Sequence, residues 1–100
     1  MPDLCVTVAH KLTQEEALNR IKRFIGSVKK QYTSNISDFQ ESWNGCVGTF
    51  KVSGRGFSGS GDVTVGPADV TLELTLPFPA MFLKGQVEST IRGQVARLLG

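Results

Sequence analysis

The feature that most constrains the fold is a series of short segments in which apolar and polar residues alternate. Alternation with a period of two places successive side chains on opposite faces of a β-strand, so that one face of the sheet is apolar and the other polar. Parallel strands are usually apolar on both faces, so the pattern predicts an antiparallel sheet with one face open to water. The clearest segment alternates Val70, Leu72, Leu74 and Leu76 with Thr71, Glu73 and Thr75.

Turn chemistry separates this strand from its predecessors. Asn44-Gly45 favours a two-residue type I′ hairpin, and Pro67 fixes the backbone at a turn before the last strand. Such short connections leave no room for crossover helices, so strands that follow one another should pair. The expected strands cover residues 4–9, 38–43, 46–53, 60–65 and 70–76.

Two segments have helical spacing. Thr13 and Glu16 form a capping box that starts a helix over about 14–32, and a second helix is predicted over about 82–99. The element order β-α-β-β-β-β-α predicts the α+β class, with a single five-stranded antiparallel sheet and both helices on its apolar face. Numbered along the chain, the preferred strand order is 2-3-4-5-1, and 1-2-3-4-5 is the alternative.

Length and composition indicate one soluble domain over residues 1–100. The chain is 40% hydrophobic and 20% charged, which is ordinary for a globular protein. No apolar run approaches the length of a transmembrane helix, and the N-terminus does not resemble a secretory signal. We therefore expect a cytoplasmic protein.

The net charge of +2 is too small to indicate a nucleic-acid partner. Nearly half of the basic residues lie on the first helix, where charged side chains usually form a solvated face. No exposed aromatic residue is expected among them, as base stacking would require. These residues are Arg20, Lys22, Arg23, Lys29 and Lys30.

The two cysteines lack the spacing of a metal site or a redox pair, and no other motif predicts a cofactor. Cys5 has the outward parity of its strand, whereas Cys46 shares the inward parity of Phe50. Because side chains on opposite faces of a sheet cannot be bridged, we expect no disulfide.

The segment Gly54–Gly59, GRGFSG, matches the dinucleotide-binding pattern GxGxxG. That pattern works only where the glycines end a parallel strand and open a helix, and here a strand follows. We interpret it as a hairpin whose glycines permit close backbone approach.

No residues suggest an active site, so we expect no enzyme. His10 is the only histidine, and a structural role is favoured over that of a general base. Asp62 and Glu73 are expected on the wet face, which offers no pocket to raise the pKa of one carboxyl. Trp43 is expected at the edge of the core.

The segment PFPAMFL, residues 77–83, is too apolar for a connection that faces only water. One interpretation is intramolecular, with Phe82 and Leu83 covering the end of the sheet. The other is a candidate contact patch for a second copy, a granule protein or a polyester surface, formed by Phe78, Met81, Phe82 and Lys84.

Four segments together resemble the polyhydroxyalkanoic acid system family of small bacterial proteins. They are AHKLTQEEALNRI, Trp43-Asn44-Gly45, GRGFSGSGDVTVG and LPFPAMFLKGQVESTIRGQV, and the likeness covers nearly the whole chain. The resemblance implies a link to polyester storage granules and supplies no reaction or cofactor. We therefore expect a noncatalytic accessory or binding protein of granule metabolism, with granule proteins, the polyester surface or a homodimer as partners.

The alternative is a small helix-grip carrier of an apolar lipid or acyl ligand. Phe24, Phe50, Phe82 and the leucines look sufficient to fill a core of this size. They should leave little room for the roughly 300 Å³ of a ligand pocket, so the carrier ranks below the accessory protein.

Overall fold

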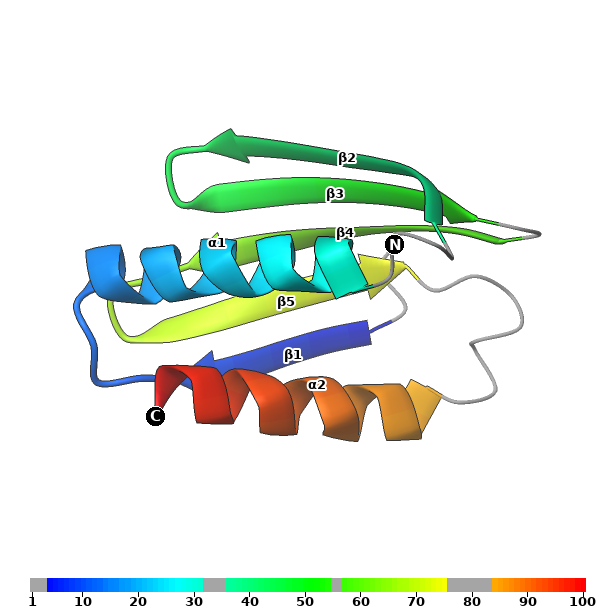
Figure 1. The fold of residues 1–100 in the computed structure, drawn as a ribbon. Coiled ribbons are helices and arrows are strands. Elements are labelled where there is room, and N and C mark those ends of the chain that lie inside the picture. Colours follow the sequence, from blue (N-terminus) through cyan, green and yellow to red (C-terminus); the bar gives the residue numbers. More distant parts are fainter. Residues whose placement is uncertain (1–3, 32–35, 55–56, 76–83) are drawn as a thin grey trace.

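In the computed structural model, residues 4–31, 36–54, 57–75 and 84–100 are described, and they form two helices and one antiparallel sheet (Figure 1). The α+β class and the element order are as predicted. The elements are β1 (Leu4–Ala9), α1 (Gln14–Gln31), β2 (Ile36–Asn44), β3 (Val47–Gly54), β4 (Phe57–Val65), β5 (Asp69–Thr75) and α2 (Lys84–Leu99).

The sheet has the order β1-β5-β4-β3-β2, which is the preferred order read from its other edge. β1 pairs antiparallel with β5, and its apolar residues lie opposite the apolar residues of that strand, for example Val6 opposite Leu72 and Val8 opposite Val70. This register places the alternating leucine and valine residues of both strands on the face that the helices cover.

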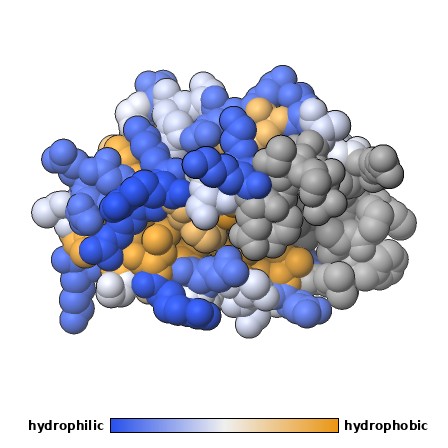
Figure 2. All heavy atoms as spheres, in the orientation of Figure 1, coloured by the Kyte–Doolittle hydropathy of each residue, from blue (hydrophilic) through white to orange (hydrophobic). Residues whose placement is uncertain are grey.

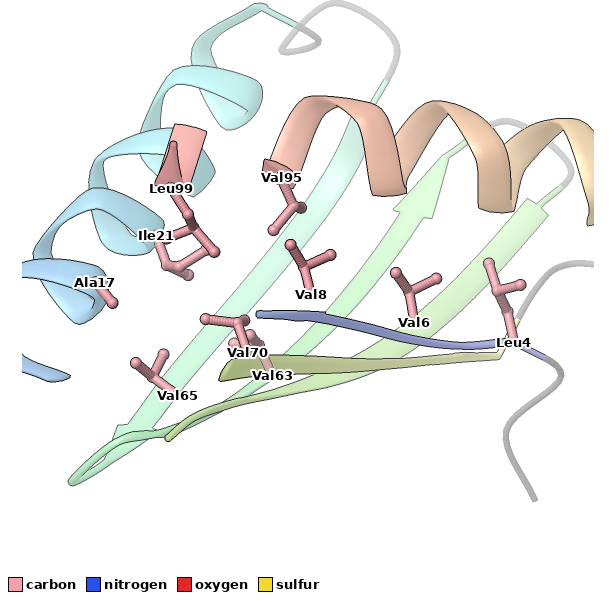
Figure 3. Packing of buried hydrophobic residues seen from close by; sticks show 10 residues of the cluster. All are labelled: Leu4, Val6, Val8, Ala17, Ile21, Val63, Val65, Val70, Val95 and Leu99. Carbon is pink, nitrogen blue, oxygen red and sulfur yellow. The ribbon is translucent and has the colours of Figure 1, made fainter. Parts of the chain in front are cut away.

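The core lies between that face and the two helices, at the β1, β5 and β4 side of the sheet (Figure 3). The side chains buried there come from the sheet and from both helices, and each stabilises the fold by about 1–3 kcal/mol through its burial. Both helices therefore pack on one face, as expected. The buried hydrophobic residues are Leu4, Val6, Val8, Ala17, Ile21, Val63, Val65, Val70, Val95 and Leu99.

Side chains fix the helices in place. The N-cap half of the predicted capping box is present at the first turn of α1, where the backbone N–H of Glu16 donates to the Thr13 hydroxyl at 3.1 Å, whereas the Glu16 carboxylate accepts from Arg20. Arg20 of α1 donates to the carbonyl of Leu98 in the last turn of α2 (3.1 Å), which ties the helices together. Arg92 of α2 donates to the Thr7 carbonyl of the edge strand β1 (3.0 Å).

The first hairpin turns one residue later than predicted. Asn44 pairs with Val47, so the loop residues are Gly45 and Cys46, and Gly45 has a φ of 63°. A positive φ at the first loop residue alone fits a type II′ turn rather than type I′. The Trp43 indole covers Gly48, where an added Cβ would lie 2.9 Å from the ring, and this pairing extends the ladder to Asn44.

Two strands begin earlier than their apolar residues predict. β2 starts at residue 36 rather than 38, and β4 starts at 57 rather than 60. The added part of β4 is rich in serine and glycine, and it pairs with residues 52–54 of β3. Each added end begins with an apolar residue, Ile36 or Phe57, but serine or glycine separates it from the alternating segment. Backbone pairing continues past these residues, so the alternation underestimates the strand length.

Candidate functional site

An apolar cleft of about 290 Å³ lies between the C-terminal half of α1 and the sheet. Phe24, Ile25 and Val28 line it from α1, and all three are partly buried. From the sheet it is lined by Phe39, Phe50, Val52, Gly59, Ser60, Gly61, Asp62, Val63, Leu72, Leu74 and Thr75.

Glycines of β4 leave space under the helix. Gly59 lies opposite Val52, and Gly61 lies between Phe50 and Leu74, so both have the parity of the helix-covered face. At Gly61 an added Cβ would lie 2.6 Å from Leu74 Cδ2 and 3.1 Å from the Glu73 carbonyl oxygen. Leu74 thus leans over Gly61 and lines the cleft where a larger residue of β4 would stand.

The expectation that large apolar side chains fill the interior is therefore wrong for the part of the chain described. Phe24 and Phe50 are only partly buried, and they line the cleft instead of closing it. Phe82, the third aromatic residue of that argument, lies outside the described residues. The volume is at the lower end of the range of roughly 300–1,000 Å³ for ligand pockets.

Aromatic residues of β2 and β3 lie beside α1 at one rim of the cleft. The Trp43 and Phe50 rings meet edge to face with centroids 5.8 Å apart, and the indole N–H donates to Glu41 at 2.7 Å. Lys29 lies over the Phe39 ring at 5.4 Å, and Lys22 lies over the Trp43 ring at 5.1 Å. Each such cation–π contact stabilises the structure by about 0.5–1 kcal/mol, so these two lysines pack onto β2.

The arginines of α1 lie on its other flank, in a shallow groove between the helices that we call the arginine groove. Arg20 and Arg23 both approach Glu16, at 3.0 and 4.0 Å. Figure 2 shows hydrophobic atoms between the helices, flanked by hydrophilic ones. Phe24 lines both the arginine groove and the apolar cleft. The groove is lined by Glu16, Arg20, Arg23, Phe24, Ser27, Arg97 and Leu98.

His10 has the predicted structural role. It is buried, the Leu12 N–H donates to its Nδ1 at 3.1 Å, and its Nε2–H donates to the Gly66 carbonyl at 3.0 Å. This pattern assigns the proton of the neutral ring to Nε2. Both nitrogens are occupied, so the ring joins the end of β1 to the β4–β5 turn.

Asp62 and Glu73 lie opposite each other on the face of the sheet away from the helices. Both are exposed, as expected, and no helix covers them. Gly54 ends β3 and pairs with Phe57 at the start of the antiparallel strand β4. The GRGFSG segment is thus a strand-to-strand junction, and the dinucleotide interpretation is excluded.

The cysteines are both free. Cys5 is exposed with outward parity, as predicted, whereas Cys46 lies in the hairpin turn and packs against the core. Within the described ranges no cluster of three or more histidine, cysteine, aspartate or glutamate side chains could hold a metal ion. No helix in those ranges is long and apolar enough to cross a membrane.

The candidate contact patch of the sequence falls almost entirely outside the described residues. This applies to Phe78, Met81 and Phe82, so their role stays a prediction. Lys84, the fourth member, is exposed as the first residue of α2.

Sequence reasoning missed the cleft, although a signal for it was present. Gly59 and Gly61 occupy positions of β4 with the same parity as Val63 and Val65. Two glycines at consecutive inward positions remove side chains from the layer that the helix covers, which predicts a gap there.

Comparison with known proteins agrees with the likeness seen in the sequence. The model of the family described as "Putative polyhydroxyalkanoic acid system protein" matches residues 4–99. Searches of curated proteins and of solved structures gave no match.

Proposed function

Because the chain belongs to the polyhydroxyalkanoic acid system family, we propose that it is a noncatalytic accessory protein of storage granules that holds apolar acyl groups in the cleft beneath α1. The observation that carries this proposal is the cleft itself, about 290 Å³ in volume and lined mainly by apolar side chains of α1 and the sheet. Polyhydroxyalkanoates present ester-linked acyl units, and an apolar cleft of this size suits the alkyl part of such a unit.

A noncatalytic role is supported by the polar groups around the cleft. His10 is the one buried polar side chain among the described residues. Both of its ring nitrogens are hydrogen-bonded to backbone groups outside the cleft. Asp62 and Glu73 direct their side chains to the opposite, open face of the sheet. His10 and Glu73 do not line the cleft, and Asp62, which borders it, is exposed and has the outward parity of its strand, so these groups are poorly placed to act as a general base on a ligand there.

Sedimentation with amorphous polyhydroxyalkanoate particles tests the proposal. Val52→Phe adds a phenyl ring inside the cleft, and Val47→Phe makes the same change on the exposed face of the same strand. The wild type and Val47→Phe should pellet with the particles, whereas Val52→Phe should lose about tenfold in affinity through overpacking of the site.

Equal pelleting of both variants would show that the cleft does not carry the interaction. Release of soluble hydroxy acids from the particles during the same incubation would contradict a noncatalytic role. Thermal melts of both variants establish that the proteins compared are folded.

The cleft also favours a second function, that of a small carrier for a single apolar lipid or acyl ligand. Its volume suits one chain, and it lies between a helix and a sheet as in helix-grip carriers. Solvent extraction of protein purified from polyester-accumulating cells, followed by mass spectrometry, should then recover an acyl compound in a molar amount close to that of the protein. Extracts without one would favour the particle-binding role.

A further inference from the structure

The apolar cleft and the arginine groove meet at one side chain. Phe24 lines both of them. Arg20, one turn earlier on α1, lines the groove, and Val28, one turn later, lines the cleft. Val28 continues the wall of the cleft, whereas Arg20 and Arg23 face α2. An apolar space and a cationic surface thus adjoin each other across a single ring.

From this arrangement we propose that the two sites together bind one ligand, a single acyl chain with an anionic head group. The chain occupies the cleft, and the head group lies in the arginine groove beyond Phe24. The proposal rests on the proposed function in one respect, namely that the cleft accepts acyl groups.

The cleft sets the length and number of chains. A volume of about 290 Å³ accommodates about ten carbons if each takes roughly the 30 Å³ of a water molecule in the liquid. A lipid with two long chains exceeds this space. The ligand class is therefore a medium-length single chain.

The arginine groove sets the charge of the head group. Three guanidinium groups and one carboxylate line it, which leaves two positive charges. Arg20 is already engaged with Glu16 and the Leu98 carbonyl. Arg23 is more open, with 74% of its side chain exposed, and Arg97 is exposed in the last turn of α2.

The chemistry of arginine suits this role. A guanidinium group presents a planar fork of N–H donors that matches the oxygen pairs of carboxylates and phosphates. Both head groups fit the same requirement for a compact anion next to Phe24. A neutral head group would gain nothing from the groove, so the contribution of the arginines is measured by comparing charged and neutral chains of equal length.

Titration calorimetry with decanoate, decanol and decyl phosphate, each below its micelle concentration or solubility limit, tests the proposal on the full chain. The cleft variant is Val52→Phe with Val47→Phe as its control. The groove variant is Arg23→Gln/Arg97→Gln, and Lys11→Gln/Lys51→Gln is its control, because it removes the same charge at exposed positions elsewhere.

We expect Val52→Phe to weaken all three ligands about tenfold through overpacking. The arginine double variant should weaken decanoate and decyl phosphate about tenfold, through the loss of charge-assisted hydrogen bonds, and leave decanol unchanged. The lysine control should bind as the wild type does. Tighter binding of decyl phosphate than of decanoate assigns the head group to a phosphate, and the reverse order assigns it to a carboxylate.

The proposal is overturned if wild-type protein does not bind decanoate, or if the arginine double variant affects decanoate and decanol equally. If the arginine double variant affects decanoate and decanol equally while Val52→Phe loses particle binding, the proposed granule function still stands. Conversely, the protein could bind decanoate through the arginines and fail to bind polyester particles. That result would support the proposed ligand and refute the granule function. The exposed arginines lie outside the core, so the test does not depend on a variant that risks unfolding.

Discussion

His10 shows how a single residue with catalytic potential is committed to structure. Its ring accepts from the Leu12 N–H and donates to the Gly66 carbonyl, and its own backbone N–H donates to the Ala68 carbonyl at 2.9 Å. The side chain therefore closes the end of the sheet where β1 meets the β4–β5 turn. A buried imidazole without these partners would be costly, so the hydrogen bonds explain why a polar ring is tolerated there.

Replacing His10 with alanine should lower the free energy of unfolding by about 2 kcal/mol, because a buried carbonyl and a backbone N–H lose their partner. Urea denaturation measures this change. Lys11→Ala, at the exposed neighbouring position, should change stability by less than about 0.5 kcal/mol. An unaltered midpoint for His10→Ala would mean that the ring has no structural role.

At the scale of elements, α1 and α2 are joined by more than their apolar stripes. Arg20 pairs with Glu16 on its own helix and donates to a carbonyl in the last turn of α2, where the helix leaves acceptors without internal partners. A positive charge there also interacts favourably with the C-terminal end of the helix dipole. Arg23, one turn away, is mostly exposed and approaches Glu16 only at 4.0 Å.

Arg20→Gln should therefore cost about 1 kcal/mol of unfolding free energy, since it removes both the ion pair and the bond to the Leu98 carbonyl. Arg23→Gln should cost less than about 0.5 kcal/mol, as is usual for exposed ion pairs. The two variants carry the same charge change, so urea midpoints compare them directly. Equal losses would indicate that long-range charge, and not the contact between helices, carries the effect.

For the whole molecule, the buried residues form an uneven core. β1, β5, β4 and both helices supply the buried residues, whereas β2 and β3 contribute aromatic side chains that are only half-buried. The cleft lies between α1 and the sheet, where the half-buried rings of Phe39 and Phe50 line it. The cleft and the buried core thus lie beside each other under α1, and Val63 belongs to both.

The two thiols lie in different environments, which a thiol reagent can measure. Cys5 lies exposed on the polar face, whereas Cys46 is half-buried against the core. We expect one fast-reacting and one slow-reacting thiol in the native protein and two free thiols in denaturant. A count of zero in denaturant would reveal a disulfide and refute the assignment of the cysteines to separate surroundings.

Much of this architecture was predictable because its causes are local. Alternation in Val70–Thr75 defined a strand and its apolar face, and short connections made consecutive strands neighbours. The N-cap residue Thr13 placed the start of α1 at the correct residue. The shift of the first turn was not predictable, because the fit of the Trp43 ring over Gly48 sets the register across two strands.

The sequence by itself determined the fold class and the side of the sheet that the helices cover, since periodicity and parity depend on the covalent chain alone. It favoured the strand order 2-3-4-5-1 over 1-2-3-4-5, and the structure decided between the two. Only the tertiary structure decided that α1 stands away from β3 and β4 to leave a cleft, and that Arg97 joins the arginines of α1 in one groove. The distance between a helix and a sheet depends on how the side chains of distant segments interlock. Phe24, Gly61 and Leu74 meet only after folding, and no local pattern specifies how they fit.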